Sequence, residues 1–461
     1  MNPSKATGPD GIPAWLLKEN ADLLADPIAD IINQSLKEQR LPQSWKNADI
    51  VPIPKQKPIK DVNKHLRPIS LTPVLSKIAE EFVVEHIKPA ILAKVDDHQY
   101  GTVPGSNTTI ALISMIHSWL SATDGNGATV RAVLFDFRKA FDLIDHKILM
   151  QKLSTFGLPS GIMNWVKDFL TDRKQRVKLS QDCYSEWGEI PAGVPQGTKM
   201  GPWLFTIMIN DLAINEVSMW KYVDDTTIAE NILKNHTSKI QQYVDSLSQQ
   251  VSANNFQLNE DKCKELRISF ARSNEVFEPI KVNNKNIDCV NKAKILGVIL
   301  SNDLKWNDHV NEVIMKVNKR LYFLSQLKRA QVKPKELTSF YTTCIRSVME
   351  YACALFHNSL PKYLSNDLEL CQRRALRIIH PGRSYEQALQ DTGLEKLCER
   401  RETITSKLFK EVCRPGHKLN NLLPPNNNCP YNLRNRRSFN KIKISTKRTR
   451  SISMQWNNTA L

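Results

Sequence analysis

The sequence predicts a mixed α+β fold, followed by a helical C-terminal region and a basic tail. Three observations support this prediction. Short apolar runs that end in acidic residues alternate with helical patterns over residues 131–305. Beyond residue 308, apolar side chains recur at the spacing of an α-helix. Residues 412–461 contain ten Lys or Arg and no Asp or Glu, so we expect this segment to be disordered or loosely ordered.

The predicted elements divide the chain into four parts, at residues 1–130, 131–305, 306–411 and 412–461. In the first part we expect helices at Ala14–Leu24, Ile28–Glu38 and Val74–Ile91, and a strand at Ala48–Ile53. In the second part, helices at Met163–Leu170 and Ser238–Asn254 separate strands that carry acids. The third part is expected to be all helical, with helices at His309–Ala330, Pro334–Met349, Asn366–Ile379 and Leu394–Val412.

The segment Tyr222-Val223-Asp224-Asp225 places two adjacent carboxylates between short apolar stretches. Neighbouring residues of a strand point to opposite faces of a sheet, so a straight strand would bury one carboxylate. A tight hairpin turn avoids that cost because both acids stand at its tip. A single Asp-Asp pair is most often a solvated turn, but a third acid upstream favours a functional site here.

Asp136 follows a short apolar run, residues 132–135, that predicts a buried strand. An acid at the end of such a strand is costly unless it is paired or bound to a metal. If Asp136 lies beside Asp224, the carboxylates repel one another, and divalent cations such as Mg²⁺ relieve that repulsion. Two such ions, about 3.5–4 Å apart, serve in-line nucleotidyl transfer. The alternative is that Asp136 caps a helix beginning near Lys139.

Residues 193–202 (GVPQGTKMGP) contain three glycines and two prolines and precede an apolar segment. This composition predicts a rigid turn followed by a helix. The glycines leave the backbone open to close approach by a ligand, and Gln196 offers an amide donor. An ordinary loop at a helix start is the alternative; the position of the loop between the two acid motifs favours a binding role.

Three segments stand in the order found in reverse transcriptases: FDFRKAFD (135–142), GVPQGTKMGP (193–202) and YVDD (222–225). The chain resembles the reverse transcriptases of non-LTR retrotransposons of the jockey and related LINE-like groups. Other segments in the family's order extend the resemblance to about residue 410, namely residues 5–13, 45–55, 66–71, 296–300 and 306–309.

The resemblance implies a right-hand polymerase with fingers, a palm built on an antiparallel sheet, and a helical thumb. Residues 1–130 correspond to an N-terminal extension and the fingers, 131–305 to the palm, and 306–411 to the thumb and C-terminal region. The reverse transcriptase domain as a whole is expected at about residues 45–300, and residues 412–461 remain the basic tail.

The resemblance also implies roles for individual residues. The catalytic residues are Asp136, Asp224, Asp225 and Lys262, of which the three acids bind metal and the lysine lies near the leaving pyrophosphate. The residues implied to bind the dNTP are Lys55, Arg67, Phe141, Gln196 and Gly197. Phe141 is the aromatic gate that excludes a ribose 2′-OH, and Tyr222 and Val223 contact the primer. The implied cofactor is a pair of Mg²⁺ ions, for which Mn²⁺ can substitute.

Several of these residues also have an ordinary explanation. Lys55 and Arg67 on a basic protein are commonly solvated surface charges. Phe141 precedes apolar residues and is compatible with the core, and Lys262 lies in a polar cluster that predicts a solvent-facing turn.

The chain departs from the family pattern in two places. Tyr222-Val223 stands where many LINE-type enzymes carry Phe-Ala. Both residues favour strands, so we still expect the hairpin. In addition, the chain opens directly on the N-terminal motif at residues 5–13, whereas relatives carry an endonuclease domain upstream. We therefore expect the chain to be a fragment of a longer element or a truncated copy.

The expected function is an RNA-directed DNA polymerase of a retrotransposon, which extends a primer 3′-OH with dNTPs on an RNA template. An RNA-dependent RNA polymerase is the nearest enzymatic alternative, and Phe141 argues against it. Group II intron maturases and telomerase-type enzymes share the palm, but the LINE-like flanking segments disfavour them. The alternative from another class is a truncated or domesticated copy that only binds RNA or DNA.

Composition is compatible with these partners. The chain has 64 Lys or Arg against 47 Asp or Glu, a net charge of +17 that favours a polyanionic partner. Its nine cysteines include no Cys-x-x-Cys pair, which suits a reducing compartment rather than a disulfide framework or a zinc site. With no signal peptide and no apolar run near the ~18–20 residues of a membrane span, we expect an intracellular, soluble protein of the nucleus, the cytoplasm or both.

Overall fold

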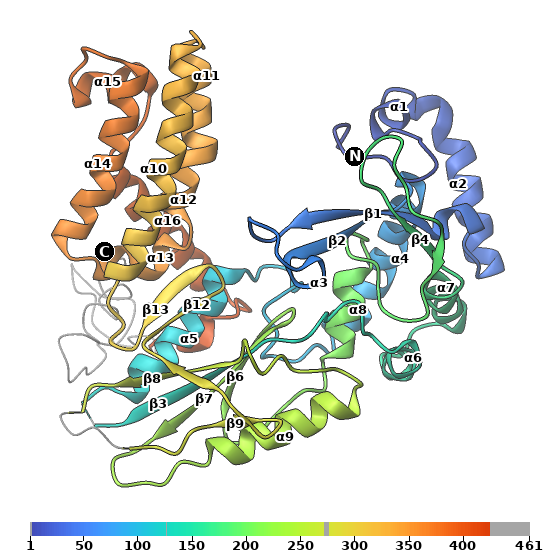
Figure 1. Cartoon of the computed structure of the whole chain (residues 1–461), viewed down its shortest axis with the longest axis horizontal. Coiled ribbons are helices and arrows are strands. Elements are labelled where there is room, and N and C mark those ends of the chain that lie inside the picture. The colour runs from blue at the N-terminus through green and yellow to red at the C-terminus, as the bar shows by residue number, and fades with distance from the viewer. Residues whose placement is uncertain (1, 126, 272–275, 425–461) are drawn as a thin grey trace, which may run out of the picture.

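The structure, a computed structural model, describes residues 2–125, 127–271 and 276–424 and has three parts. A central sheet forms the base, and a smaller sheet with the N-terminal helices and a lobe of C-terminal helices rise on opposite sides of it (Figure 1). The predicted α+β fold and the predicted helical C-terminal region are therefore confirmed.

The central sheet has the strand order β11-β8-β3-β7-β6. Its strands are β3 (Thr129–Phe135), β6 (Ser218–Tyr222), β7 (Asp225–Ile232), β8 (Lys264–Ser269) and β11 (Asp288–Val290). All neighbours are antiparallel except β11 and β8, which are parallel. Because side chains alternate along β3, Val130 and Ala132 contribute to one hydrophobic cluster while Val133 and Phe135 contribute to another. Both faces of the sheet are therefore buried.

Helices cover the two faces of the central sheet (Figure 1). One face packs against α5 (Thr108–Ala122) and the C-terminal lobe, and the other against α8 (Gly201–Met208) and α9 (Ile240–Ala253). On the first face the rings of Trp119 and Trp220 meet edge to face, 6.3 Å apart. The helix expected at Ser238–Asn254 is confirmed by α9, whereas α5 was not predicted.

The smaller sheet has the strand order β2-β1-β4-β5 and joins distant parts of the chain. Its strands are β1 (Asn47–Pro54), β2 (Leu66–Leu71), β4 (Lys174–Val177) and β5 (Gly188–Glu189). Strand β4 pairs in parallel with β1, and Arg176 forms an ion pair of 2.8 Å with Asp49 across that pairing. Residues 174–189 of the predicted second part thus lie with the N-terminal residues.

The N-terminal helices differ in one place from the prediction. The structure has α1 (Ala14–Glu19), α2 (Ala21–Glu38) and α4 (Val74–Leu92) there, and α4 confirms the expected Val74–Ile91. In the second part, α7 (Ser160–Leu170) confirms the helix expected at Met163–Leu170. The helix boundary expected before Ile28 is wrong, because Pro27 lies inside α2. The boundary between the two helices is at Asn20 instead. The Asn20 side chain donates to the carbonyl of Leu16 at 2.9 Å and so ends α1. Leu23, four residues before Pro27, is 78% exposed, so water can satisfy the carbonyl that Pro27 leaves unbonded.

The C-terminal lobe is helical, as expected. Its α-helices are α10 (Asn307–Arg329), α11 (Pro334–Phe340), α12 (Ser347–Glu350), α13 (Cys353–Phe356), α14 (Lys362–Ile379), α15 (Tyr385–Thr392) and α16 (Leu397–Val412). The single helix expected at Pro334–Met349 is interrupted by a π-helical turn at Tyr341–Arg346. The buried Tyr341 hydroxyl there donates to Gln372 at 2.6 Å, so the wider turn reaches a polar partner on α14.

Residues 412–424 of the predicted tail belong to this folded lobe. They include a 3₁₀ turn at Asn420–Leu422, and Leu419 is fully buried in the larger hydrophobic cluster. The rest of the predicted tail, residues 425–461, lies outside the described residues.

The remaining short elements are α3 (Val62–His65), α6 (His146–Ser154), and the two-stranded pairs β9 (Lys281–Val282) with β10 (Lys285–Asn286) and β12 (Lys292–Ile295) with β13 (Val298–Ser301). Across residues 2–424, gaps aside, none of the helices combines the length and the apolar character needed to cross a bilayer. The cysteines within the same ranges are all free thiols.

Candidate active site

The predicted hairpin carries two of the acids. Strands β6 and β7 pair so that Tyr222 faces Asp225, which leaves Val223 and Asp224 as a two-residue turn. Val223 has a φ of +57°, a left-handed conformation that costs a β-branched residue free energy. The hairpin is therefore confirmed, but Val223 occupies its turn rather than a strand, because the register places Tyr222 last in β6.

Asp136 comes directly after β3, at the same end of the sheet. The pairing of Phe135 with Thr226 places Asp136 opposite the start of β7, where Asp225 lies. A helix cap at Asp136 is wrong: residue 137 forms a β-bridge, residues 138–143 form turns, and the next helix, α6, is capped by Asp145. The Asp145 carboxylate accepts from the backbone N–H groups of residues 147 and 148 at 2.8 and 3.0 Å.

Two side chains hold Asp136 in place. Lys262 Nζ lies 3.2 Å from Asp136 Oδ2, so the predicted lysine does reach the acids although its side chain is 63% exposed. Asn259 donates its side-chain amide to the same oxygen at 3.0 Å, and its backbone N–H to the Asp136 carbonyl at 2.7 Å. Sequence reasoning missed Asn259; its signal was its position three residues before Lys262 in the same polar turn.

The acids perturb one another electrostatically. Desolvation, followed by the charges of Asp224 and Asp136, raises the pKa of Asp225 to about 6. Desolvation also raises the pKa of Asp224, and the charge of Asp136 adds to that effect. Two carboxylates with raised pKa values beside a third acid fit a divalent cation, which prefers oxygen ligands and relieves like-charge repulsion.

The side chains of the acids are not arranged as a preformed metal site in the described residues. Among the residues that the structure describes, no group of three or more His, Cys, Asp or Glu side chains is arranged to hold a metal ion. The contacts of Asp136 explain this in part, because one of its carboxylate oxygens already faces Lys262 and Asn259.

Two predicted cations approach the acids from the smaller sheet. Lys55 and Arg67 lie at the end of the β1–β2 pairing where the chain connects the two strands, and Arg67 there is exposed and faces residue 53 across the strands. Desolvation lowers the pKa of Lys55, and the nearby charges of Lys262 and Arg67 lower it further. The Lys55 ammonium thus lies within electrostatic range of both other cations and of the carboxylate of Asp136.

The glycine-rich loop lies between the two sheets and confirms the expected loop-then-helix pattern, since α8 begins at Gly201. Gln196 donates its amide to Asp142 at 3.0 Å, and its carbonyl accepts from the Ser70 N–H of β2 at 2.8 Å. Gly197 has a φ of +107°, and a Cβ there would lie 3.1 Å from the Ser70 carbonyl, so this position requires glycine.

Glu80 of α4 supports the same loop and was missed by sequence reasoning. Its fully buried carboxylate accepts from the backbone N–H groups of Lys199 and Met200 at 2.7 and 3.2 Å, just before α8. A carboxylate at a helix N-terminus is stabilising, so Glu80 fixes the direction in which the loop enters α8. A buried acid inside an apolar helix was the available signal.

Phe141 is half-buried and stacks on Phe205 of α8, with ring centroids 4.7 Å apart. Its backbone carbonyl accepts from the Val194 N–H at 2.8 Å, which joins it to the glycine-rich loop. Phe141 therefore belongs partly to the core, as the ordinary explanation held, and partly to the loop that carries Gln196. Tyr222 is half-buried as well, and desolvation and the nearby Tyr351 raise its pKa.

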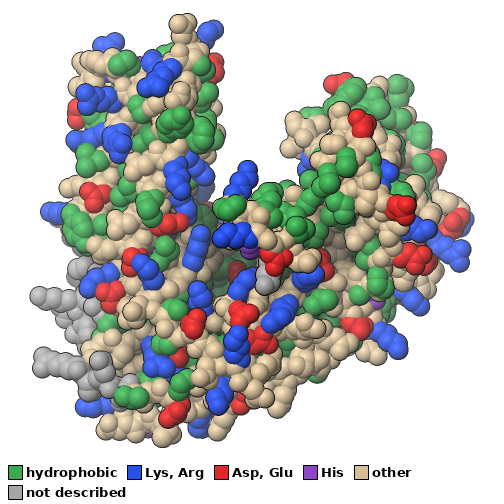
Figure 2. Space-filling view, in the orientation of Figure 1, with side chains coloured by type: hydrophobic (Ala, Val, Ile, Leu, Met, Phe, Trp, Pro, Cys, Tyr) green, Lys and Arg blue, Asp and Glu red, His purple; other side chains and the backbone are tan. Residues whose placement is uncertain are grey.

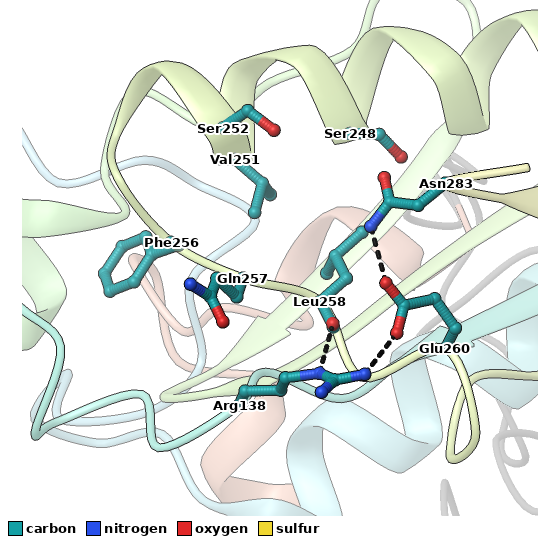
Figure 3. A pocket seen from close by; sticks show the side chains of 9 residues that line it. All are labelled: Arg138, Ser248, Val251, Ser252, Phe256, Gln257, Leu258, Glu260 and Asn283. Carbon is teal, nitrogen blue, oxygen red and sulfur yellow. Dashed lines mark hydrogen bonds and ion pairs between the residues drawn. The ribbon is translucent and has the colours of Figure 1, made fainter.

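A polar cavity of about 370 Å³ lies beside this site (Figure 3). Arg138 donates to the Leu258 carbonyl at 3.1 Å and to Glu260 at 2.6 Å, and Glu260 accepts from Asn283 at 2.7 Å. These contacts fix the segment that contains Asn259, and through it Asp136. None of the predicted site residues lines the cavity.

Two parts of the chain match known protein families. Residues 53–300 match the family described as reverse transcriptase (RNA-dependent DNA polymerase). Residues 306–347 match the N-terminal region of alkylated DNA repair protein alkB homolog 8, a match confined to part of the C-terminal lobe. Among solved structures, a telomerase from Candida tropicalis in complex with a TWJ fragment of telomeric RNA has a TM-score of 0.44 and 12% identity, over 87% of this chain and 67% of that chain.

Two curated relatives come from mobile elements of Drosophila melanogaster. The chain is 26% identical to the RNA-directed DNA polymerase from mobile element jockey, over 88% of this chain and 46% of that protein. It is 25% identical to the probable RNA-directed DNA polymerase from transposon BS, over 87% of this chain and 46% of that protein. The chain thus spans about half the length of the curated relatives it matches. Because the family match covers more than half of the chain, this protein belongs to the reverse transcriptase family and is related to the polymerases of jockey-type non-LTR retrotransposons.

Proposed function

We propose that this chain is an RNA-directed DNA polymerase that extends a primer 3′-OH with dNTPs on an RNA template, as part of a retrotransposon. The observation that carries the proposal is the meeting of three acids at one end of the central sheet with cations from outside it. Asp136, Asp224 and Asp225 share that end, and Lys262 lies 3.2 Å from Asp136.

The three parts of the molecule take the roles of a right-hand polymerase in this proposal. Residues 131–305 form the palm around the acids, 1–130 the fingers and N-terminal extension, and 306–411 the helical thumb and C-terminal region. Strands β4 and β5 join the fingers, since β4 pairs with β1. Lys and Arg side chains gather around the hollow between the fingers and the thumb (Figure 2), which supports passage of a nucleic acid there.

The acids would hold two divalent cations, Mg²⁺ with Mn²⁺ as a possible substitute. When bound, such cations lower the pKa of the attacking hydroxyl and neutralise the charge that develops on the phosphates. Among the residues, Asp224 and Asp225 supply carboxylates from the hairpin, and Asp136 supplies one from β3. The raised pKa values of Asp224 and Asp225 support this role, because a cation site is where carboxylates tolerate such crowding.

The basic residues would hold the triphosphate. Arg67 offers a planar fork for phosphate oxygens, and Lys55 a point charge beside it. Lys262 is proposed to face the departing pyrophosphate, for which its exposed ammonium is available once it leaves Asp136. The 3′ oxygen of the primer would attack the α-phosphorus while the bond to pyrophosphate breaks.

The loop and the gate would select the nucleotide. Gln196 and Gly197 lie against Ser70 of β2, the strand that also carries Arg67, which supports contact with the incoming dNTP. Phe141 lies between that loop and the core, and we assign it the exclusion of a ribose 2′-OH. Tyr222 and Val223 stand directly before the acids of the hairpin and are proposed to contact the primer end.

A primer-extension assay tests the function. The purified protein is given a heteropolymeric RNA template, an annealed DNA primer, Mg²⁺ and dNTPs, and product lengths are resolved on a gel. We expect extension with dNTPs and little with rNTPs, abolished by EDTA. Tight RNA binding without extension would instead identify a copy that only binds nucleic acid. Preferential extension with rNTPs would identify an RNA polymerase.

A further inference from the structure

A short strap, residues 96–101, lies along the end of β6 just before the acids. The Tyr100 N–H donates to the Lys221 carbonyl at 2.7 Å, and the Lys221 N–H donates to the His98 carbonyl at 2.8 Å. Gln99 and Lys221 thus form a parallel bridge outside the named strands. The strap therefore adds backbone hydrogen bonds to the strand residue that precedes the YVDD segment.

The strap also touches the turn itself. The Gln99 side chain is buried, and its oxygen accepts from the N–H groups of Gly101 at 2.8 Å and Val223 at 3.4 Å. A Cβ on Gly101 would lie 2.6 Å from the Val223 backbone nitrogen and 2.7 Å from its Cγ2. Val223 holds a left-handed conformation that is unfavourable for a β-branched residue and persists only where surrounding structure imposes it. The strap supplies that surrounding structure.

The buried side chain of Lys221 binds the first residue of the strap. Lys221 Nζ forms an ion pair of 2.5 Å with Asp96, at the start of the strap, although the lysine side chain is fully buried. The same ammonium donates to three carbonyls after α8, those of residues 209, 210 and 212, at 3.1, 3.2 and 2.9 Å. With all its protons directed at oxygens, Lys221 links the strap, the hairpin and the end of α8.

The segment that follows α16 reaches the same strap. Lys418 donates from Nζ to the Gln99 carbonyl and lies 4.5 Å from the centre of the Tyr100 ring. Its neighbour Leu419 is fully buried, and Asn420 donates to the Val412 carbonyl at 3.0 Å, so this segment is firmly attached to the lobe. The last described residues thus connect the helical lobe to the support of the hairpin.

We propose that Lys418 is a positioning residue for the acids, acting through the strap. It fixes Gln99, which accepts from Val223, and Tyr100, which donates to Lys221, and so holds the turn that carries Asp224. The inference rests on the proposed function, since the geometry of the turn matters for catalysis only if its acids serve the polymerase. It makes residues 413–424 part of the catalytic unit, although they follow the proposed palm by more than a hundred residues.

The experiment compares Lys418→Met with wild type. Methionine keeps an apolar stem over Tyr100 and removes the donor and the charge. We expect kcat for primer extension to fall about tenfold and more Mg²⁺ to be needed for half-maximal rate, with an unchanged KM for the primer–template, because displacement of a reacting group by about 1 Å costs up to a hundredfold. Lys418→Arg should restore kcat to within about threefold, since it keeps both cation and donor.

The matched control is Lys410→Met, on an exposed position of α16 in the same lobe. It should match wild type in kcat and in Mg²⁺ dependence. Thermal melting checks that each variant is folded, and Lys418→Gln replaces Lys418→Met if the latter does not fold. An unchanged kcat and Mg²⁺ dependence in folded Lys418→Met or Lys418→Gln would overturn the proposal.

A second measurement does not depend on activity. Hydrogen–deuterium exchange of the metal-free protein, followed in peptides covering residues 97–103 and 218–226, should be faster in Lys418→Met than in Lys410→Met. If wild type shows no primer extension, the proposed polymerase function fails, and this exchange difference still decides whether Lys418 supports the hairpin. Equal exchange in the two variants would overturn the proposal whatever the activity.

Discussion

The acidic and the basic halves of the site are built in different ways. All three acids stand at one end of one sheet, two on a hairpin and Asp136 directly after the neighbouring strand β3. Their positions are fixed by the backbone register of β3, β6 and β7. The cations come from elsewhere: Lys55 and Arg67 lie on the second sheet, and Lys262 lies on an exposed turn.

This difference suggests a division of labour. The hydrogen-bond register of the strands fixes the backbone positions of the acids relative to one another. The positions of the cations depend instead on how two sheets pack and on long, rotatable side chains. Groups that must meet reacting atoms need the first kind of support, and groups that attract a polyanion tolerate the second. Substitutions among the acids should therefore lower kcat, and substitutions among the cations should mainly raise the KM for dNTP.

The largest expected effect is at Asp224. Asp224→Asn removes a charge at nearly constant volume and should lower the rate of extension more than ~10³-fold while folding and RNA binding persist. Asp182→Asn, at an exposed position of the β4–β5 connection, is the matched control and should behave as wild type. The measurement is single-turnover extension with saturating dNTP. Activity of Asp224→Asn within tenfold of wild type would remove Asp224 from the catalytic set.

Phe141, at the boundary between the two halves, should control the choice of sugar. Phe141→Val opens space where a 2′-OH would collide, so the ratio of kcat/KM for a dNTP over the matching rNTP should fall about a hundredfold. Phe205→Leu disturbs the same ring stack, at 4.7 Å, without opening the gate, and should leave the ratio within about threefold of wild type. An unchanged ratio in Phe141→Val would show that another residue excludes ribonucleotides.

The basic half is best tested at Arg67. Arg67→Ala should reduce kcat/KM for dNTP by about tenfold to hundredfold, mostly through KM, because a hydrogen bond to a charged group contributes about 1.5–3 kcal/mol. Arg67→Lys should recover only part of the loss, since a lysine cannot bind two phosphate oxygens in one plane. The control, Lys37→Ala, removes an exposed cation from α2. A loss confined to kcat would contradict the expectation that the cations act mainly through the KM for dNTP.

The crowding of the acids predicts a dependence of stability on pH. Because the folded-state pKa of Asp225 is about 6, above its ordinary value of 3.8, its contribution to stability is present at low pH and is lost as pH rises from about 4 to 6. In EDTA, Asp225→Asn should therefore raise Tm by about 1–2 °C at pH 7.5 and by less at pH 4.5. Saturating Mg²⁺ should abolish the gain. A stabilisation equal at both pH values would assign the effect to packing instead of charge.

The smallest effect is expected from residues 425–461, which hold eight of the ten cations in the predicted basic tail. Deleting them should weaken RNA binding at low salt and flatten its dependence on salt concentration, and should leave the rate of chemistry unchanged. The deletion begins after residue 424 because Lys418 and Leu419 are part of the folded lobe. Equal salt slopes for the two proteins would show that this segment adds nothing to binding.

The sequence by itself determined the elements whose signals are local. A two-residue turn between apolar stretches, an acid after a buried run, and apolar side chains at helical spacing are set by neighbours within a few residues. The YVDD hairpin, the strand before Asp136 and the helices of the C-terminal region were predictable for that reason. The position of Val223 in the turn was not predictable. A shift of one residue in the strand register decides whether Val223 is the last residue of β6 or the first residue of the turn.

Only the tertiary structure decided which distant residues support the site. Asn259 reaches Asp136 across 123 positions, Glu80 caps the glycine-rich loop across 119 and 120, and Lys418 meets Gln99 across 319. No periodicity encodes such contacts, because they depend on how sheets and helices pack after each has formed. Charged residues within apolar segments, such as Glu80 and Lys221, were one sign of these contacts in the sequence, since a buried charge requires a partner that only the folded chain supplies.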